Sequence, residues 1–161
     1  MARFDQETAV SAMEIHQLIA DWGHELDMNG GLGVAGLITE DCTYRVGGVA
    51  YLGHGPVTKF YSDRGERVRT QQKDGVRTQR HTITNLRVAF QDKSHAAVTF
   101  IIVNYSAEGK PPVDLTGPTI LADCRMECRR DADGEWRICL FDSTPMFVGS
   151  DPFLNASVVK R

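Results

Sequence analysis

The 161-residue sequence lacks any apolar run long enough to span a bilayer, which takes about 20 residues. Residues Met1–Val10 contain no apolar segment of the secretory type, so we expect a cytoplasmic location and no membrane partner. Charge of one sign is also scarce, because 18 Lys and Arg stand against 21 Asp and Glu, a formal net charge of -3. This balance argues against a protein that binds nucleic acid by neutralising phosphates. The length predicts one domain over residues 1–161, with terminal segments at 1–6 and 150–161.

Cysteine is sparse, with four residues at positions 42, 124, 128 and 139. Cys124 and Cys128 lie in a segment that alternates like a strand. Four residues along a strand span about 13 Å, which is too far to share one metal ion or to form a disulfide. We therefore expect reduced thiols that act as small core residues, and no metal site.

Two further motifs lack the context that nucleotide or nucleic-acid binding needs. Residues 31–36 match the pattern GxGxxG, but the preceding segment is helical in pattern and no strand–helix–strand unit follows. Residues 63–80 have an excess of basic side chains, but no aromatic residue lies between 62 and 80 to stack on bases. We expect a helix–helix connection, a solvated loop and no cofactor.

Helical patterns come first in the chain. Apolar residues at 15, 18, 19, 22 and 26 form one stripe, which predicts a helix over 7–28 that ends at Asn29-Gly30-Gly31. A short helix over 34–39, a hairpin over 42–52 that turns at Gly47-Gly48, and a helix over 56–67 follow. Residues 68–79 are polar and are expected to be irregular.

Four long strand patterns, at 80–90, 96–107, 117–130 and 135–147, make up the rest of the chain. No helical segment separates them, so they predict an antiparallel meander. Helices followed by such a sheet indicate an α+β fold in which the sheet folds over the helices. Both faces of residues 96–105 are apolar, which predicts a homodimer or homotrimer. The apolar tail 145–159 is expected to cap a cavity or to pack on a neighbouring subunit.

Two titratable residues stand out. His81 opens the first long strand, and a bulge near Thr84-Asn85 would let both His81 and Phe90 point inward. Asp27 lies at the end of the first helix, beside its apolar stripe. Each can be a structural residue, but together they can also form a pair in which the carboxylate orients an imidazole base.

The chain resembles the SnoaL-like proteins of the nuclear transport factor 2-like superfamily, especially scytalone dehydratase and hexachlorocyclohexane dehydrochlorinase. The segment EIHQLIADWGHELD is similar to the family's first helix, which ends in a catalytic aspartate, here Asp27. RHTITNLRVAF is similar to the strand with the catalytic histidine, here His81, and DCTYRV to the strand that presents a tyrosine, here Tyr44. GEWRI resembles the opening of the last strand. Leu26 stands where the dehydratase has a second tyrosine, and Trp22 where the dehydrochlorinase has a lysine.

The resemblance implies a cone-shaped barrel, in which a curved antiparallel sheet is closed over about three helices around a mostly apolar cavity. It implies a cofactor-independent lyase in which His81 removes a proton from a hydrophobic aromatic or alicyclic molecule and Asp27 orients His81. Elimination of water or halide and retro-aldol-type deformylation are the reactions considered. The expected lining residues are Trp22, Tyr44, Phe60 and Asn104. The indole at position 22 suggests a substrate that is more aromatic, or less anionic in its transition state. Two alternatives stay open: a non-catalytic binding or polyketide-cyclase-like protein, and a small structural subunit of a ring-hydroxylating dioxygenase.

Overall fold

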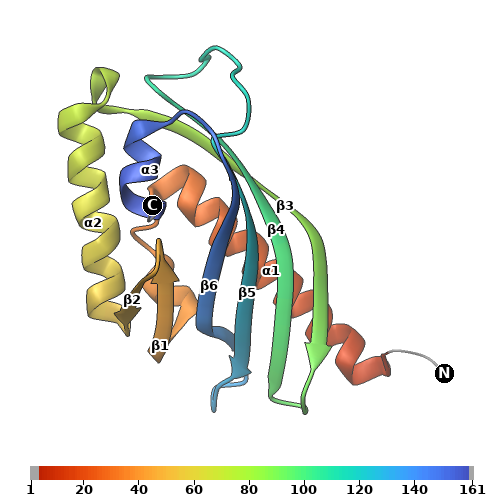
Figure 1. Cartoon of the computed structure of the whole chain (residues 1–161). Helices are drawn as coiled ribbons and strands as arrows, with labels where there is room; N and C mark the ends of the chain where they lie inside the picture. The colour runs from red at the N-terminus through yellow and green to blue at the C-terminus, as the bar shows by residue number, and fades with distance from the viewer. Residues whose placement is uncertain (1–3, 160–161) are drawn as a thin grey trace.

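Within residues 4–159, which the computed structural model describes, three α-helices pack against one curved six-stranded sheet (Figure 1). The helices are α1 (Gln6–Asn29), α2 (His54–Gln71) and α3 (Pro152–Val158), and two 3-10 turns cover Val34–Leu37 and Lys73–Gly75. The strands are β1 (Ile38–Val46), β2 (Val49–Leu52), β3 (Arg77–Phe90), β4 (His95–Glu108), β5 (Ile120–Arg130) and β6 (Trp136–Val148). None of the helices in this range is both long and apolar enough to cross a membrane.

The sheet confirms the predicted α+β class and differs from the prediction in two details. Its strand order is β2-β1-β6-β5-β4-β3, and β3 to β6 form the predicted antiparallel meander. However, β1 pairs with β6 in parallel, so the sheet is mixed. Strands β2 and β3 lie at its two edges, so the sheet is curved but not closed into a barrel. The predicted hairpin at Gly47-Gly48 is present, where both glycines have positive φ.

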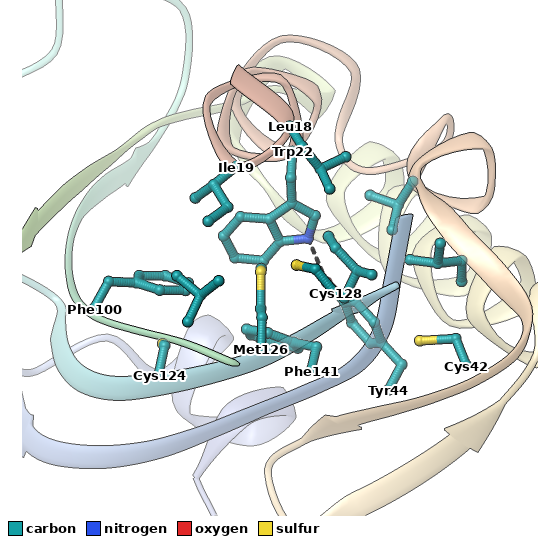
Figure 2. Packing of buried hydrophobic residues seen from close by; sticks show 14 of the residues in the cluster. Leu18, Ile19, Trp22, Cys42, Tyr44, Phe100, Cys124, Met126, Cys128 and Phe141 are labelled. Atoms are coloured by element: carbon teal, nitrogen blue, oxygen red, sulfur yellow. Dashed lines mark hydrogen bonds between the residues drawn. The ribbon is translucent and has the colours of Figure 1, made fainter. Parts of the chain in front are cut away.

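Helix α1 provides most of the surface on which the sheet folds. It begins with a capping box between Asp5 and Thr8 and ends at Gly30, whose φ of 65° is left-handed. The predicted stripe is the buried face of the helix, and Ile15, Ile19 and Trp22 are almost completely removed from solvent. Figure 2 shows the Trp22 indole pointing from α1 into the core, toward Met126 and Phe141 of the sheet.

Two predicted boundaries were wrong around the polar segment 68–79. Helix α2 continues to Gln71, and β3 already begins at Arg77. Arg77, Thr78 and Gln79 pair in register with β4, although none of them is apolar. The hydrophobic pattern missed this part of β3 because its inward side chains make buried polar contacts. The predicted helix at 34–39 is only a 3-10 turn, and β1 begins earlier than predicted, at Ile38.

The predicted bulge in β3 is present. Pairing with β4 shifts between Thr84 and Arg87, and Asn85 has a φ of 54°. This extra residue changes which side of the strand faces the helices. His81 therefore lies on the cavity, while Phe90 packs against the core at the other end of the same strand.

The four cysteines are free thiols, and Cys42, Cys124 and Cys128 are buried in the core. Burial raises the pKa of each of these three thiols to about 12. They are therefore protonated and shielded at neutral pH, as small core residues should be.

The outer face of the sheet has an apolar row across β4, β5 and β6. Val103, Leu121 and Phe147 are register partners, and Phe147 is 70% exposed.

We propose that a second copy of this chain covers this row, in a homodimer or homotrimer. Light scattering at micromolar concentration should give two or three times the 17.9 kDa chain mass, and Phe147→Arg should lower it. A mass of 17.9 kDa for the unaltered protein would contradict the proposal.

Candidate functional site

A cavity of about 100 Å³ lies between the three helices and the inner face of the sheet. Its walls are mostly aromatic and aliphatic, with a few polar side chains that converge on one space. The sequence-predicted residues Trp22, Tyr44, Phe60, His81 and Asn104 all line it. Helix α3 contributes Leu154 and Val158, so the C-terminal tail caps the cavity of its own chain.

Asp27 and His81 lie in direct contact at one wall of this cavity. The distance between Asp27 Oδ1 and His81 Nδ1 is 2.6 Å, and the two side chains are only 11% and 15% exposed. The backbone N–H of His81 also donates to the Asp27 carboxylate, at 3.0 Å from Oδ2. The last turns of α1 and the start of β3 are thus joined at the carboxylate, which fixes both the ring and the main chain of His81.

The second ring nitrogen of His81 meets Asn104. A carboxylate can only accept hydrogen bonds, so Nδ1 of a neutral ring carries the hydrogen and Nε2 is an acceptor. Asn104 Nδ2 lies 3.1 Å from Nε2 and is the matching donor. The amide is held in turn by the Thr119 hydroxyl, which donates to Asn104 Oδ1 at 2.6 Å. Asn104 is 1% exposed, so this arrangement is shielded from water.

A second chain of hydrogen bonds joins Trp22, Tyr44 and Tyr61. Trp22 Nε1 donates to Tyr44 Oη at 3.0 Å, which is the dashed line in Figure 2. Tyr44 Oη and Tyr61 Oη are 2.6 Å apart. Burial is the largest cause that raises the pKa of both phenols, so both remain protonated at neutral pH. The sequence prediction placed Leu26 where a second tyrosine was expected and did not foresee that Tyr61 of α2 contacts Tyr44.

Arg64 brings a cation to the cavity, which the sequence prediction missed. Its guanidinium donates from Nη2 to Gln79 Oε1 at 2.7 Å, and Gln79 Nε2 donates to the carbonyl of Leu26 at 2.5 Å. Burial is the main cause that lowers the pKa of Arg64. Tyr61 and Arg64 follow Val57 at helical spacings of four and seven, so they continue the buried face of α2. Both residues lie within the predicted helix 56–67, so this spacing was a usable signal, but the basic residues from 63 to 80 were interpreted as a solvated loop or lid.

Helix α3 is fastened over the cavity by a buried ion pair. Arg77 Nη2 contacts Asp151 Oδ2, and the two side chains are 4% and 10% exposed. Asp151 is also the N-cap of α3, because its side chain accepts from the N–H of Leu154 at 3.1 Å. Ser106 lies between this pair and Thr119, with its hydroxyl 2.7 Å from Arg77 Nη2 and 3.2 Å from Thr119 Oγ1.

Metal-binding side chains do not gather at the site. In the part of the chain that the structure describes, no group of three or more His, Cys, Asp or Glu residues is placed to hold a metal ion. The polar groups of the cavity walls are the imidazole of His81 with its carboxylate partner, two phenols, two amides, one guanidinium, the Ser143 hydroxyl and the Trp22 indole N–H.

A curved sheet that folds over helices around such a cavity defines the cone-shaped α+β proteins of the nuclear transport factor 2-like superfamily. Within it, residues 7–142 match the family model for the SnoaL-like domain. The chain therefore belongs to the SnoaL-like family, as its sequence motifs predicted. A search of curated protein sequences found no match.

Solved structures share the fold at low sequence identity. A protein described as a "Putative Scytalone Dehydratase" from Novosphingobium aromaticivorans has a TM-score of 0.71 and 18% identity, covering 88% of this chain and 87% of that chain. ActVI-ORFA from Streptomyces coelicolor has a TM-score of 0.72 and 18% identity, covering 88% and 98%. A Nostoc punctiforme protein of unknown function with a cystatin-like fold has a TM-score of 0.69 and 16% identity, covering 92% and 96%. At these identities the likeness concerns the fold alone.

Proposed function

We propose that the protein is a cofactor-independent lyase that acts on a small hydrophobic aromatic or alicyclic molecule. The observation that carries the proposal is the 2.6 Å contact between Asp27 Oδ1 and His81 Nδ1 at the wall of a mostly apolar cavity. A low-dielectric cavity with few convergent polar groups is typical of a small-molecule site. One structural relative is described as a "Putative Scytalone Dehydratase", which is in keeping with this class of reaction.

His81 Nε2 acts as the general base in this proposal. When the substrate binds, its acidic C–H or O–H group takes the place of the Asn104 amide as the group that faces Nε2. His81 then removes the proton from that carbon or hydroxyl group. Asp27 holds the ring and stabilises the imidazolium that forms. In an elimination, the C–H electron pair forms the double bond and the leaving group departs with its bonding pair. A halide leaves as the anion, whereas a hydroxyl group takes up the proton held by the His81 imidazolium and leaves as water. In a retro-aldol cleavage, the O–H proton goes to His81, the C–C bond breaks, and the new carbanion is protonated.

The test uses 5-nitrobenzisoxazole, a small aromatic carbon acid. A base removes its ring C–H proton, the N–O bond breaks, and a nitrile and a coloured phenolate form. The wild-type protein should open this ring faster than free imidazole at the same concentration, because the base is positioned in an apolar cavity. Aromatic β-hydroxy ketones, vicinal halides and aryl diols can then be screened for loss of water, halide or formaldehyde.

Absence of any acceleration would overturn the lyase proposal. Recovery of a bound aromatic molecule without turnover would then favour a binding protein of the same fold. Co-purification of a second, iron–sulfur chain would favour the dioxygenase-subunit alternative.

A further inference from the structure

We infer that the substrate of this cavity carries an acidic oxygen, a carboxylate or an ionised phenol, which is bound by Arg64 together with the hydroxyl of Tyr61. The inference rests on the proposed function, because it names the substrate class for the same cavity. It keeps the expected aromatic character of the substrate but revises the alternative of a less anionic transition state, because Arg64 on α2 supplies the cation that position 22 of α1 lacks.

The first argument is the unneutralised charge of Arg64. Among residues 4–159, the ion pairs do not include Arg64, and its hydrogen-bond partner there is the neutral amide of Gln79. The orientation of that amide is set, because Gln79 Nε2 donates to the Leu26 carbonyl. The contact with Gln79 therefore positions the Arg64 guanidinium but does not neutralise its positive charge. A partly buried cation without a carboxylate partner is costly, and a ligand anion that shares its environment removes that cost.

The second argument is the direction of the tyrosine protons. Tyr44 is completely buried, and its hydroxyl contacts Trp22 Nε1 and Tyr61 Oη. Trp22 can only donate, so Tyr44 satisfies its own O–H only by donating to Tyr61. The hydroxyl proton of Tyr61 is then not used in the Tyr44 contact, and Tyr61 lines the cavity, so this O–H group can donate to a ligand. The chain from Trp22 through Tyr44 polarises this last O–H group, which makes it a better donor to an anionic oxygen.

The third argument is the charge of a groove that shares two wall residues with the cavity. This groove, of about 700 Å³, lies outside the cavity, between α2, α3 and the β1–β2 hairpin, and Phe60 and Arg64 line both spaces. The charged residues of the groove are Lys59, Asp63, Arg64 and Arg67, an excess of positive charge. Asp63 is itself paired with Lys59 at 2.7 Å. A groove of this charge attracts anions toward Arg64.

The position of Arg64 also limits the shape of the ligand. Its partner Gln79 and the base His81 are two residues apart on β3 and both line the cavity. Two residues of a strand span ~7 Å, which is about the width of a substituted ring. The structure thus favours a small aromatic or alicyclic acid whose acidic group and reactive hydrogen lie on opposite sides of one ring.

The test compares the binding of benzoate and benzamide, which have nearly the same shape but differ in charge. By calorimetry, the wild-type protein should bind benzoate at least about tenfold more tightly than benzamide. Arg64→Met should reduce this ratio to about one. Arg69→Met is the matched control, because it removes the same charge from an exposed site on α2 where Arg69 pairs with Glu66, and it should keep the ratio.

The preference should survive His81→Ala, so this experiment and the test of the proposed base can fail separately. If Arg64→Met does not fold, Arg64→Gln, which can still donate to Gln79, replaces it. Equal affinities for the two ligands in the wild type would overturn the inference, as would a benzoate preference that persists without Arg64. Failure of the wild type to bind benzoate at millimolar concentration would also overturn it.

Discussion

Replacing His81 with alanine is expected to lower kcat for the opening of 5-nitrobenzisoxazole by about 100-fold or more. The reason is that Nε2 of His81, which lines the cavity, is the proposed base, and alanine has no proton acceptor at that place. KM should change little, because the apolar walls that bind the ring stay in place. Stopped-flow or plate-reader absorbance of the phenolate product gives both constants.

Two variants separate a catalytic from a structural role of the pair. Asp27→Asn should cost no more than His81→Ala, because the imidazole remains but loses the charge and the tautomer preference that the carboxylate provides. His24→Ala is the matched control, since His24 is an exposed histidine on the same helix as Asp27, and it should keep full activity. Nearly full activity of His81→Ala would show that the pair is structural.

Replacing Asp151 with alanine is expected to lower the free energy of unfolding by about 3 kcal/mol or more. The change leaves the guanidinium of Arg77, which is only 4% exposed, without its counter-charge. It also removes the N-cap of α3, the helix that covers the cavity. Urea or thermal unfolding followed by circular dichroism measures the loss.

Asp151→Asn keeps a side chain that can cap α3, so it separates the lost ion pair from the lost cap. Most of the destabilisation should remain in this variant. Glu66→Ala removes an exposed carboxylate from the surface pair with Arg69 and should change stability little. If Asp151→Ala is as stable as Glu66→Ala, the buried pair does not hold α3 in place.

The order and type of the elements could be predicted because their patterns are local. Burial on one face of each element produces the apolar stripe of α1 and the alternation of the four long strands. The turn at 47–48 is marked by its two adjacent glycines. The parallel pairing of β1 with β6 could not, because it joins residues about one hundred positions apart and no local pattern encodes it. The open edges of the sheet depend on the same long-range pairing.

The candidate site was less accessible to sequence reasoning than the fold. Asp27, His81, Tyr44 and Trp22 came from the family resemblance, whereas Phe60 and Asn104 were predicted only as lining residues. Five of the six line the cavity, and Asp27 contacts it through His81. Tyr61 and Arg64 were missed although they lie in the predicted helix 56–67, because no motif marked them and only the tertiary structure places that face of α2 on the cavity. Gln79 was missed because the polar stretch 68–79 is typical of a solvated loop. Thr119 was missed for a related reason, since its contact with Asn104 depends on the pairing of β4 with β5.

The central claim is that Asp27 and Asn104 hold neutral His81 in one tautomer. Its hydrogen is on Nδ1, which donates to Asp27, and its lone pair is on Nε2, which accepts from Asn104. Long-range proton–nitrogen NMR of labelled histidine distinguishes the two neutral tautomers and the imidazolium form directly. At a pH where the ring is neutral, the wild type is expected to show the Nδ1–H tautomer at His81, and Asp27→Asn is expected to lose that preference. A neutral His81 with its hydrogen on Nε2 in the wild type would contradict the account.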